Sequence, residues 1–383
     1  MIQSTLLLAA VIAAATALAF WLDHAVPLLS KAGASLLALA LGAALSNAGL
    51  VPAASPVYDA IGGPVTSLAI AWLLLHVNLG DLRRVGPRMM GAFALAVAGT
   101  ALGALTGALL FAGFFGEDTW RLAGTLTGTY TGGSVNFVAV GRGVGLPDAL
   151  FAGANAADAL TTALWLGATL LLPVWLARFY PTPIPVHLEA DAEGGAAEPH
   201  PHPFFLRQPI STLDLATLVA TGLLLLVASQ GMGRLFPAIP SVLWLTTFAL
   251  LVGHTAHFRA ERGALQLGTL ALHFFFVVIG IHSRISEIVA VGMEVFYLTL
   301  AVVAVHGIVV YGGGRIARID VGTLSVASQA AIGGPSSALA VAVSREWPAL
   351  VLPGVIVGLL GYALGNYLGF GVAYLVRAVG IGL

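Results

Sequence analysis

Residues 89–115 read MMGAFALAVAGTALGALTGALLFAGFF, a run without a single charged side chain. A helix needs about 20 apolar residues to cross the roughly 30 Å of hydrocarbon in a bilayer. This run is therefore long enough to span a membrane as a helix. Similar runs recur along the chain, and the ten-residue alternation typical of membrane β-barrels is not seen between them. The sequence predicts an α-helical membrane protein.

The composition supports the same class. Hydrophobic residues make up 58% of the 383 residues and charged residues only 9%, whereas a soluble domain carries about 25% charged residues. The net charge is −1 and the sole lysine is Lys31, so neither a nucleic-acid surface nor a polybasic lipid anchor is indicated. The absence of cysteine excludes disulfides, thiol catalysis and iron–sulfur clusters. We expect a multi-pass protein of the cell membrane, the inner membrane in a bacterium.

Hydropathy gives twelve candidate spans, the first of which has no Lys or Arg before it and is therefore read as a span, not a signal peptide. The one long polar segment, residues 178–210, is rich in proline and acidic residues and reads as a linker. We expect a first repeat at 1–177 and a second at 211–383. The candidate spans are residues 4–22, 31–51, 60–79, 89–115, 121–144, 148–176, 212–233, 241–257, 264–282, 292–314, 321–343 and 349–377.

The two halves of the chain resemble each other. Thr131–Ser134 in the fifth span aligns with Ile332–Pro335 in the eleventh at an offset of 201 residues, and the same offset pairs Pro147 with Pro348 without a gap. Duplicated halves are characteristic of secondary transporters. The alignment therefore predicts an internal repeat.

The distribution of Lys and Arg tests whether the second repeat is inverted, because positive loops stay in the cytoplasm. In the first half, the side that holds Lys31 and Arg142 carries five of these residues against two on the other side. The corresponding loops of the second half carry three against six. This reversal predicts inverted repeats, although six spans in each half would make the repeats parallel. We follow the charge asymmetry and expect about 11 to 13 transmembrane helices.

The fifth span of each half is a poor helix. Residues 126–136 read LTGTYTGGSVN and residues 325–337 read SVASQAAIGGPSS. Glycine costs about 1 kcal/mol and proline about 3 kcal/mol in a helix interior, so we expect one discontinuous helix in each repeat. Freed backbone groups must then line a cavity, although these glycines could also serve only close helix packing. The expected substrate-binding residues are Thr131, Gly132, Gly133, Ser134, Asn136, Gly333, Gly334 and Ser336.

Asp158 lies about ten residues into an apolar span, where a carboxylate costs about 2.5 to 3.5 kcal/mol. Asn155, Asp158 and Thr162 share one helical face and offer several oxygen ligands. Such a face suits a sodium ion, or a proton, because burial favours the neutral carboxylic acid. The alternative is a carboxylate that only hydrogen-bonds a neighbouring helix. The expected ion-coupling residues are Asn155, Asp158, Thr162, Gln329 and Ser337.

Enzyme classes find less support in the sequence. An intramembrane aspartyl protease needs two mid-span aspartates, and only Asp158 qualifies. Ser134 and His306 stay open as a hydrolase pair, but no Gly-x-Ser-x-Gly context is present. Neither a phosphate loop nor a dinucleotide fingerprint occurs, which argues against ATP-driven transport. We therefore do not expect an enzyme or a bound cofactor, and a channel is the remaining alternative.

Four motifs together resemble the YjcL-like family of uncharacterised multi-span membrane proteins, over nearly the whole chain. They are TGGSVNFVAV at 131–140, AAD at 156–158, ASQAAIGGPSSA at 327–338 and PGV at 353–355. That family is similar in outline to the bile acid–sodium symporter and sodium–proton antiporter group. The resemblance implies a panel domain and a core domain, built from inverted repeats whose discontinuous helices cross.

By the same resemblance Asp158 would hold the coupling ion, although the adjacent acidic or Asn-Asp pair of the antiporters is spread here as Asn155 and Asp158. We expect a secondary transporter that moves a small organic solute, an anion among the candidates, with sodium or protons by alternating access. The alternative is a cation–proton antiporter in which Asp158 binds cation and proton in turn. The expected partners are the lipid bilayer, the solute and the ion, and a homodimer through the panel helices is compatible with this interpretation.

Overall fold

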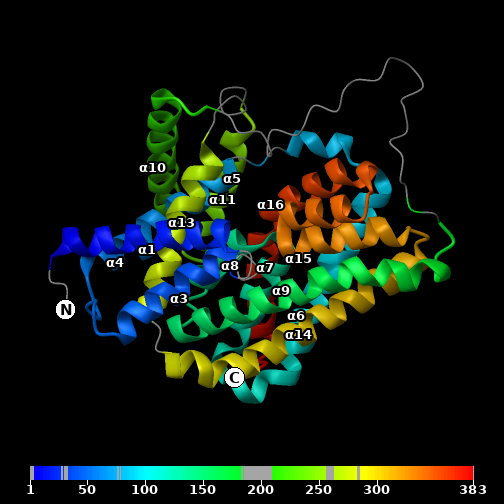
Figure 1. Cartoon of the computed structure of the whole chain (residues 1–383), viewed down its shortest axis with the longest axis horizontal. Helices are drawn as coiled ribbons and strands as arrows, with labels where there is room; N and C mark the ends of the chain where they lie inside the picture. The colour runs from blue at the N-terminus through cyan, green and yellow to red at the C-terminus, as the bar shows by residue number, and fades with distance from the viewer. Residues whose placement is uncertain are drawn as a thin grey trace.

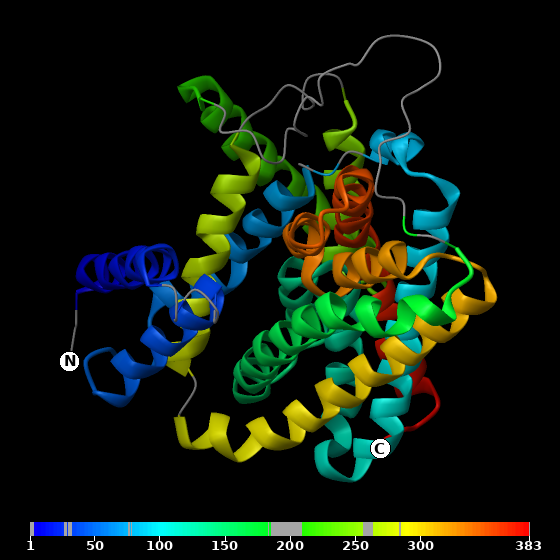
Figure 2. The same cartoon turned by 45° about the vertical axis from the view of Figure 1, so that its right-hand side comes forward.

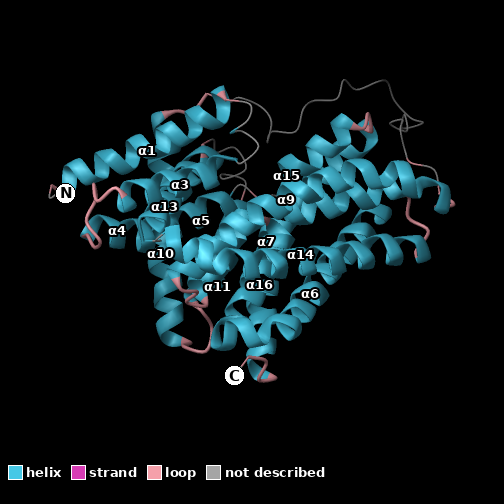
Figure 3. Ribbon diagram, turned by 60° about the horizontal axis from the view of Figure 1, so that its bottom comes forward, coloured by secondary structure: helices cyan, strands magenta, loops and turns pink. Residues whose placement is uncertain are grey.

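The computed structural model describes the chain as helices joined by short connections (Figure 3). The described residues are 4–26, 29, 33–75, 77, 79–182, 184, 209–255, 263–282 and 285–382, with backbone only at 285–292. Within these ranges every regular element is a helix. The predicted all-α class is therefore confirmed, whereas most of the predicted linker at 178–210 lies outside the described residues.

The described helices follow one another along the chain, and the longest interval between them is that from η4 to α10. In chain order they are α1 (Thr5–Ala25), α3 (Gly33–Asn47), α4 (Pro56–Ala60), the π-helical turn η1 (Ile61–Val65), α5 (Thr66–Leu75), η2 (Leu79–Arg84), α6 (Pro87–Phe115), η3 (Gly116–Asp118), α7 (Thr119–Gly132), α8 (Ser134–Gly143), α9 (Asp148–Leu176), η4 (Ala177–Phe179), α10 (Thr212–Leu235), α11 (Ser241–Gly253), α13 (Ala264–His282), α14 (Ile285–Ile316), α15 (Val321–Ser344) and α16 (Pro348–Ala378).

Several helices begin at polar caps that the sequence provides. The Ser4 hydroxyl accepts a hydrogen bond from the backbone amide of residue 7 at the start of α1. The Asp320 carboxylate accepts one from the backbone amide of residue 323 at the start of α15. Ser211 and Asp214 form a reciprocal capping box at the start of α10. These contacts satisfy amides that have no partner inside the helix, so each helix starts at a defined residue.

Nine helical segments of the described chain are long and apolar enough to cross a membrane. One of them, Pro87–Gly132, joins α6 and α7, and the apolar helices α3 and α11 are shorter, with 15 and 13 residues. Each of the twelve predicted spans coincides with a helix or with consecutive helices. The count of spans by length is nonetheless nine, below the 11 to 13 expected, because α3 and α11 are too short and α6 and α7 form one continuous segment. Helix α3 ends at Asn47, and Gly49 after it has a left-handed φ of 68°.

The helices form two bundles (Figures 1 and 2). The first, here the α13 bundle, contains α1, α3, α4, α5, α10, α11 and α13. The second, the α16 bundle, contains α6 to α9 and α14 to α16. Helices pack mainly within their own bundle, and α9 with α3 and α13 and α11 with α16 are among the contacts that cross between bundles. Each bundle therefore takes helices from both halves of the chain.

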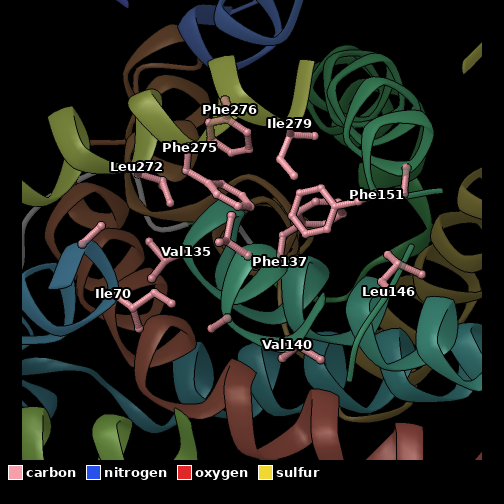
Figure 4. Close-up of a cluster of buried hydrophobic side chains, with 14 of the residues drawn as sticks. Ile70, Val135, Phe137, Val140, Leu146, Phe151, Leu272, Phe275, Phe276 and Ile279 are labelled. Carbon is pink, nitrogen blue, oxygen red and sulfur yellow. The ribbon is translucent and has the colours of Figure 1, made fainter. Parts of the chain in front are cut away.

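An aromatic cluster lies where the bundles meet (Figure 4). Phe151 of α9 packs edge-on against Phe137 of α8, with ring centroids 4.6 Å apart, and against Phe275 of α13, with centroids 5.5 Å apart. All three rings are fully buried. Van der Waals packing drives the association of helices in a membrane, so this close-packed cluster stabilises the junction.

An ionic cluster adjoins these rings. Asp148 at the start of α9 accepts from Arg142 of α8 at 3.1 Å and lies 3.2 Å from the Nδ1 atom of His282 in α13. The Arg142 guanidinium also lies over the Phe275 ring, 4.7 Å from its centroid. Asp148 and Arg142 thus connect the α16 bundle to α13 by charge as well as by packing.

Candidate functional site

The backbone leaves the helical conformation at two equivalent glycines. Gly133 separates α7 from α8 and has φ 78° and ψ −166°. Gly334, 201 residues later, has φ 77° and ψ −171° within α15. Only glycine adopts this region of φ and ψ readily, so the second glycine of each Gly-Gly pair permits the change of direction.

Helix α16 packs closely against both glycine positions. A Cβ atom added to Gly358 would lie 2.7 Å from the backbone nitrogen of Pro335, and one added to Gly361 would overlap the carbonyl oxygen of Thr131. Small residues on membrane helices allow backbones to approach in this way. The glycines of α16 therefore bring α7 and α15 onto one helix.

Tyr362 of α16 lies between the two glycine positions. Its Cε1 atom is 3.7 Å from the place of a Cβ on Gly133 and 3.6 Å from that of a Cβ on Gly334. The Tyr362 side chain is partly exposed, and Ser134 and Ser336 next to the two breaks are exposed. We call these five residues the crossing region, which presents hydroxyl groups and helix N-termini.

Asp158 lies on α9, partly exposed, and faces hydroxyl groups of α7. Its two carboxylate oxygens accept from Thr129 and Thr162, each at 3.4 Å. The hydroxyl of Tyr130 lies beside the same carboxylate and makes no hydrogen bond of normal geometry within the described part of the chain. These residues form the carboxylate cluster, whose groups are all hard oxygens of the kind that sodium or a proton binds.

The Asp158 carboxylate has further hydroxyls close by. Thr161 of α9 and Thr299 of α14 share a hydrogen bond of 2.7 Å, and both lie beside the Tyr130 hydroxyl. Asn155, one turn before Asp158 on the same helix, is 5% exposed. The structure thus places the predicted residues Asn155, Asp158 and Thr162 on one helix and brings Thr162 into contact with the carboxylate.

Gln329 and Ser337 are placed elsewhere. The Gln329 side chain accepts from Thr169 at 3.3 Å, and Thr169 lies about 16 Å along α9 from Asp158 at 1.5 Å per residue. Ser337 donates to the carbonyl of Gly333 at 2.9 Å. A Cβ on Gly333 would touch both side chains, so Gln329 and Ser337 adjoin one another near the second glycine break.

Five residues of these sites were missed by sequence reasoning: Thr129, Tyr130, Thr161, Thr299 and Tyr362. Thr129 and Tyr130 lie inside the quoted glycine-rich stretch, so their hydroxyls were a signal that could have been used. Thr299 and Tyr362 lie in apolar runs, and only the packing of α14 and α16 reveals their positions.

His306 belongs to a buried hydrogen-bond network at the centre of the α16 bundle. Thr100 donates to the carbonyl of Tyr130 at 2.8 Å, so its oxygen accepts from Nδ1 of His306 at 3.0 Å. The Nε2 atom then accepts from Ser328 at 2.8 Å, and Trp165 donates to the same serine at 2.9 Å. Both ring nitrogens of His306 are therefore engaged by Thr100 and Ser328, and neither is engaged by Ser134.

Replacing Ser328 by alanine should destabilise the protein by about 3 kcal/mol, because it removes the partner of the His306 Nε2 atom and of the Trp165 indole N–H, and each buried orphan costs about 1 to 3 kcal/mol. Ser337→Ala is the matched control, since among the described residues the Ser337 hydroxyl bonds only within its own helix, and its loss should cost about 1 kcal/mol or less. Thermal unfolding of the purified variants in detergent measures the difference. Equal shifts for the two variants would contradict the network.

The fold and these clusters define a multi-pass helical membrane protein in which Gly133 and Gly334 have similar non-helical backbone angles and a carboxylate lies inside a membrane helix. The chain belongs to the family described as protein of unknown function (DUF819), whose family model matches residues 10–379. It is similar to the uncharacterized membrane protein YjcL of Bacillus subtilis (strain 168), at 27% identity over 356 residues that cover 89% of each chain. The resemblance to YjcL and the membrane location are thus confirmed, and the function has to be argued from the site.

Proposed function

We propose that this protein is a secondary active transporter that couples a small organic solute to sodium or protons by alternating access. The observation that carries the proposal is the position of Thr129, one turn before the first glycine break. Its hydroxyl donates to Asp158, and its carbonyl accepts the amide of Gly133 at 2.6 Å. An ion bound at Asp158 therefore acts on the same turn of helix that ends at the crossing region.

The crossing region is suited to bind the solute. Helix α8 starts at Ser134, and the second part of α15 starts after Gly334. Helix N-termini carry a partial positive charge and free amides, and two of them approach the Tyr362 ring. These features favour a solute with a negatively charged or acceptor-rich group, held by Ser134, Ser336 and Tyr362.

The packing of the helices supports the internal repeat on which the proposal rests. Contacts between helices recur with the two halves exchanged: α1–α13 with α10–α5, α3–α13 with α11–α5, and α14–α9 with α16–α6. A two-fold relation between repeats produces this exchange. Together with the reversed Lys and Arg distribution, it favours inverted repeats with one discontinuous helix in each.

The two bundles supply the parts for alternating access. Fewer helix contacts join the bundles than lie within them, which is the arrangement that a shift of one bundle against the other requires, although the buried rings at the junction would have to repack during that shift. The α16 bundle holds both the carboxylate cluster and the crossing region, so it corresponds to the core domain of the proposed transporter. The α13 bundle then corresponds to the panel.

A cation–proton antiporter is the second candidate. It is favoured by the hydroxyl partners of Asp158, Thr129 and Thr162, because such a site can exchange a cation for a proton without an organic solute. Protons and sodium would then compete for one carboxylate.

Reconstitution of the full chain into proteoliposomes tests both candidates. Thermal stabilisation by small metabolites first identifies solutes, since a ligand at 100 times its Kd stabilises by about 2.7 kcal/mol. Solute uptake driven by a sodium or pH gradient supports the coupled transporter, and sodium-driven pH change without solute supports the antiporter. Solute flux that depends on neither the sodium gradient nor the pH gradient would overturn the proposal.

A further inference from the structure

Asn136 in the first turn of α8 has an amide whose orientation is fixed by its neighbours. Its Nδ2 atom lies 3.0 Å from the backbone carbonyl of Tyr362, which can only accept, so this atom must be the nitrogen. The same nitrogen donates to Asn366 at 2.9 Å, and Asn366 donates in turn to Thr246 of α11 at 2.8 Å. Both N–H groups of Asn136 are used, and its Oδ1 atom points the other way.

That oxygen is buried without a donor. Asn136 is fully buried, and its Oδ1 atom has no hydrogen-bond partner among the described residues. A Cβ placed on Gly132 would overlap both this oxygen and the carbonyl oxygen of Gly361, so the two oxygens adjoin at Gly132. Two acceptors side by side in a low-dielectric interior are unfavourable unless a positive group lies between them.

The end of α7 adds to this negative potential. Gly132 is the last residue of α7, and a helix C-terminus carries a partial negative charge and carbonyls without helical partners. The hydroxyl of Thr131, on the same turn, is also fully buried and without a partner in the described part of the chain. Every one of these groups offers a neutral oxygen.

We infer that the end of α7 forms a sodium site, made by Asn136 Oδ1, the Gly361 carbonyl and the last turn of α7, separate from the carboxylate cluster. Hard neutral oxygens suit an alkali cation, whereas divalent cations bind mainly through carboxylates. The site is a binding property that stands whether or not the chain transports a solute. If the protein binds sodium here but shows no coupled flux, this inference stands and the proposed function is wrong.

Sodium binding to the purified full chain in detergent tests the site, with radioactive sodium as probe and choline and potassium chloride as ionic controls. The Asp158→Asn variant serves as background, so that the carboxylate cluster does not contribute. We expect this variant to keep saturable sodium binding, and Asn136→Leu added to it to weaken that binding at least about tenfold.

Asn366→Leu is the matched control, because it breaks the same Asn136–Asn366 hydrogen bond and leaves the Oδ1 atom in place. It should retain sodium binding. If Asn136→Leu does not fold, Thr131→Val in the same background is the second test, because it removes the unpartnered hydroxyl on the last turn of α7 with little change of shape; it should also weaken sodium binding. Loss of all binding in Asp158→Asn alone, or unchanged binding after the substitutions at Asn136 and Thr131, would overturn the site and indicate a bound water.

Discussion

Replacing Asp158 by asparagine should abolish the coupling of solute movement to the ion. The substitution keeps the shape of the side chain and one of the two oxygens that accept from Thr129 and Thr162 but removes the negative charge. We expect the apparent affinity of this cluster for sodium to fall about 100-fold, which corresponds to about 2.8 kcal/mol at 1.4 kcal/mol per tenfold change. Uptake in proteoliposomes with an imposed sodium gradient measures the loss.

The pH dependence gives a second readout of the same substitution. Protons compete with sodium for a carboxylate, so the apparent sodium affinity of the native protein should weaken as the pH falls. The amide of Asp158→Asn cannot bind a proton in this range, and its residual transport should not depend on pH in this way. Asp59→Asn is the control, since Asp59 is an exposed carboxylate on α4. If the Asp158→Asn variant couples solute to the ion as the native protein does, Asp158 has only a structural role.

Replacing Gly361 by alanine should cause a large loss of stability. A Cβ there would overlap the carbonyl oxygen of Thr131 and press on the Cα atom of Gly132, so α16 has to move away from α7. Overpacking in a closely packed interior costs about 1 to 3 kcal/mol, and a clash with backbone should lie at the upper end. Thermal unfolding in detergent measures the change.

Gly167→Ala in α9 is the matched control for this substitution. Nothing lies within 4 Å of a Cβ at Gly167, and alanine is the better helix former by about 1 kcal/mol. The control should therefore be neutral or slightly stabilising. A similar loss in both variants would mean that the glycines of α16 do not set the distance to α7.

Much of the helical structure could be predicted from hydropathy alone. The spans expected at 148–176 and 264–282 coincide with α9 and α13, because long apolar runs in a membrane have no alternative to a helix. The change of backbone direction near Gly133 and Gly334 followed from glycine and proline chemistry. The two bundles did not follow, since the packing of α13 against α3 and α5 depends on shapes that hydropathy does not encode.

The candidate site was predictable only in part. The cost of a buried charge singled out Asp158, and helical spacing added Thr162. Gln329 was grouped with them by chemistry, but the structure places it with Thr169, farther along α9. Helical spacing predicts which residues lie together on one helix. Contacts between helices depend on where the helices cross, and the sequence does not reveal these crossing points.

The position of Tyr362 has a consequence for stoichiometry. One carbon of its ring lies next to both Gly133 and Gly334, so a molecule at one glycine occupies space that a molecule at the other would need. A solute bound by the proposed transporter in the crossing region would therefore occupy one place, and not one place at each glycine. We expect calorimetric titration with any transported solute to saturate at one molecule per chain, without cooperativity within the chain.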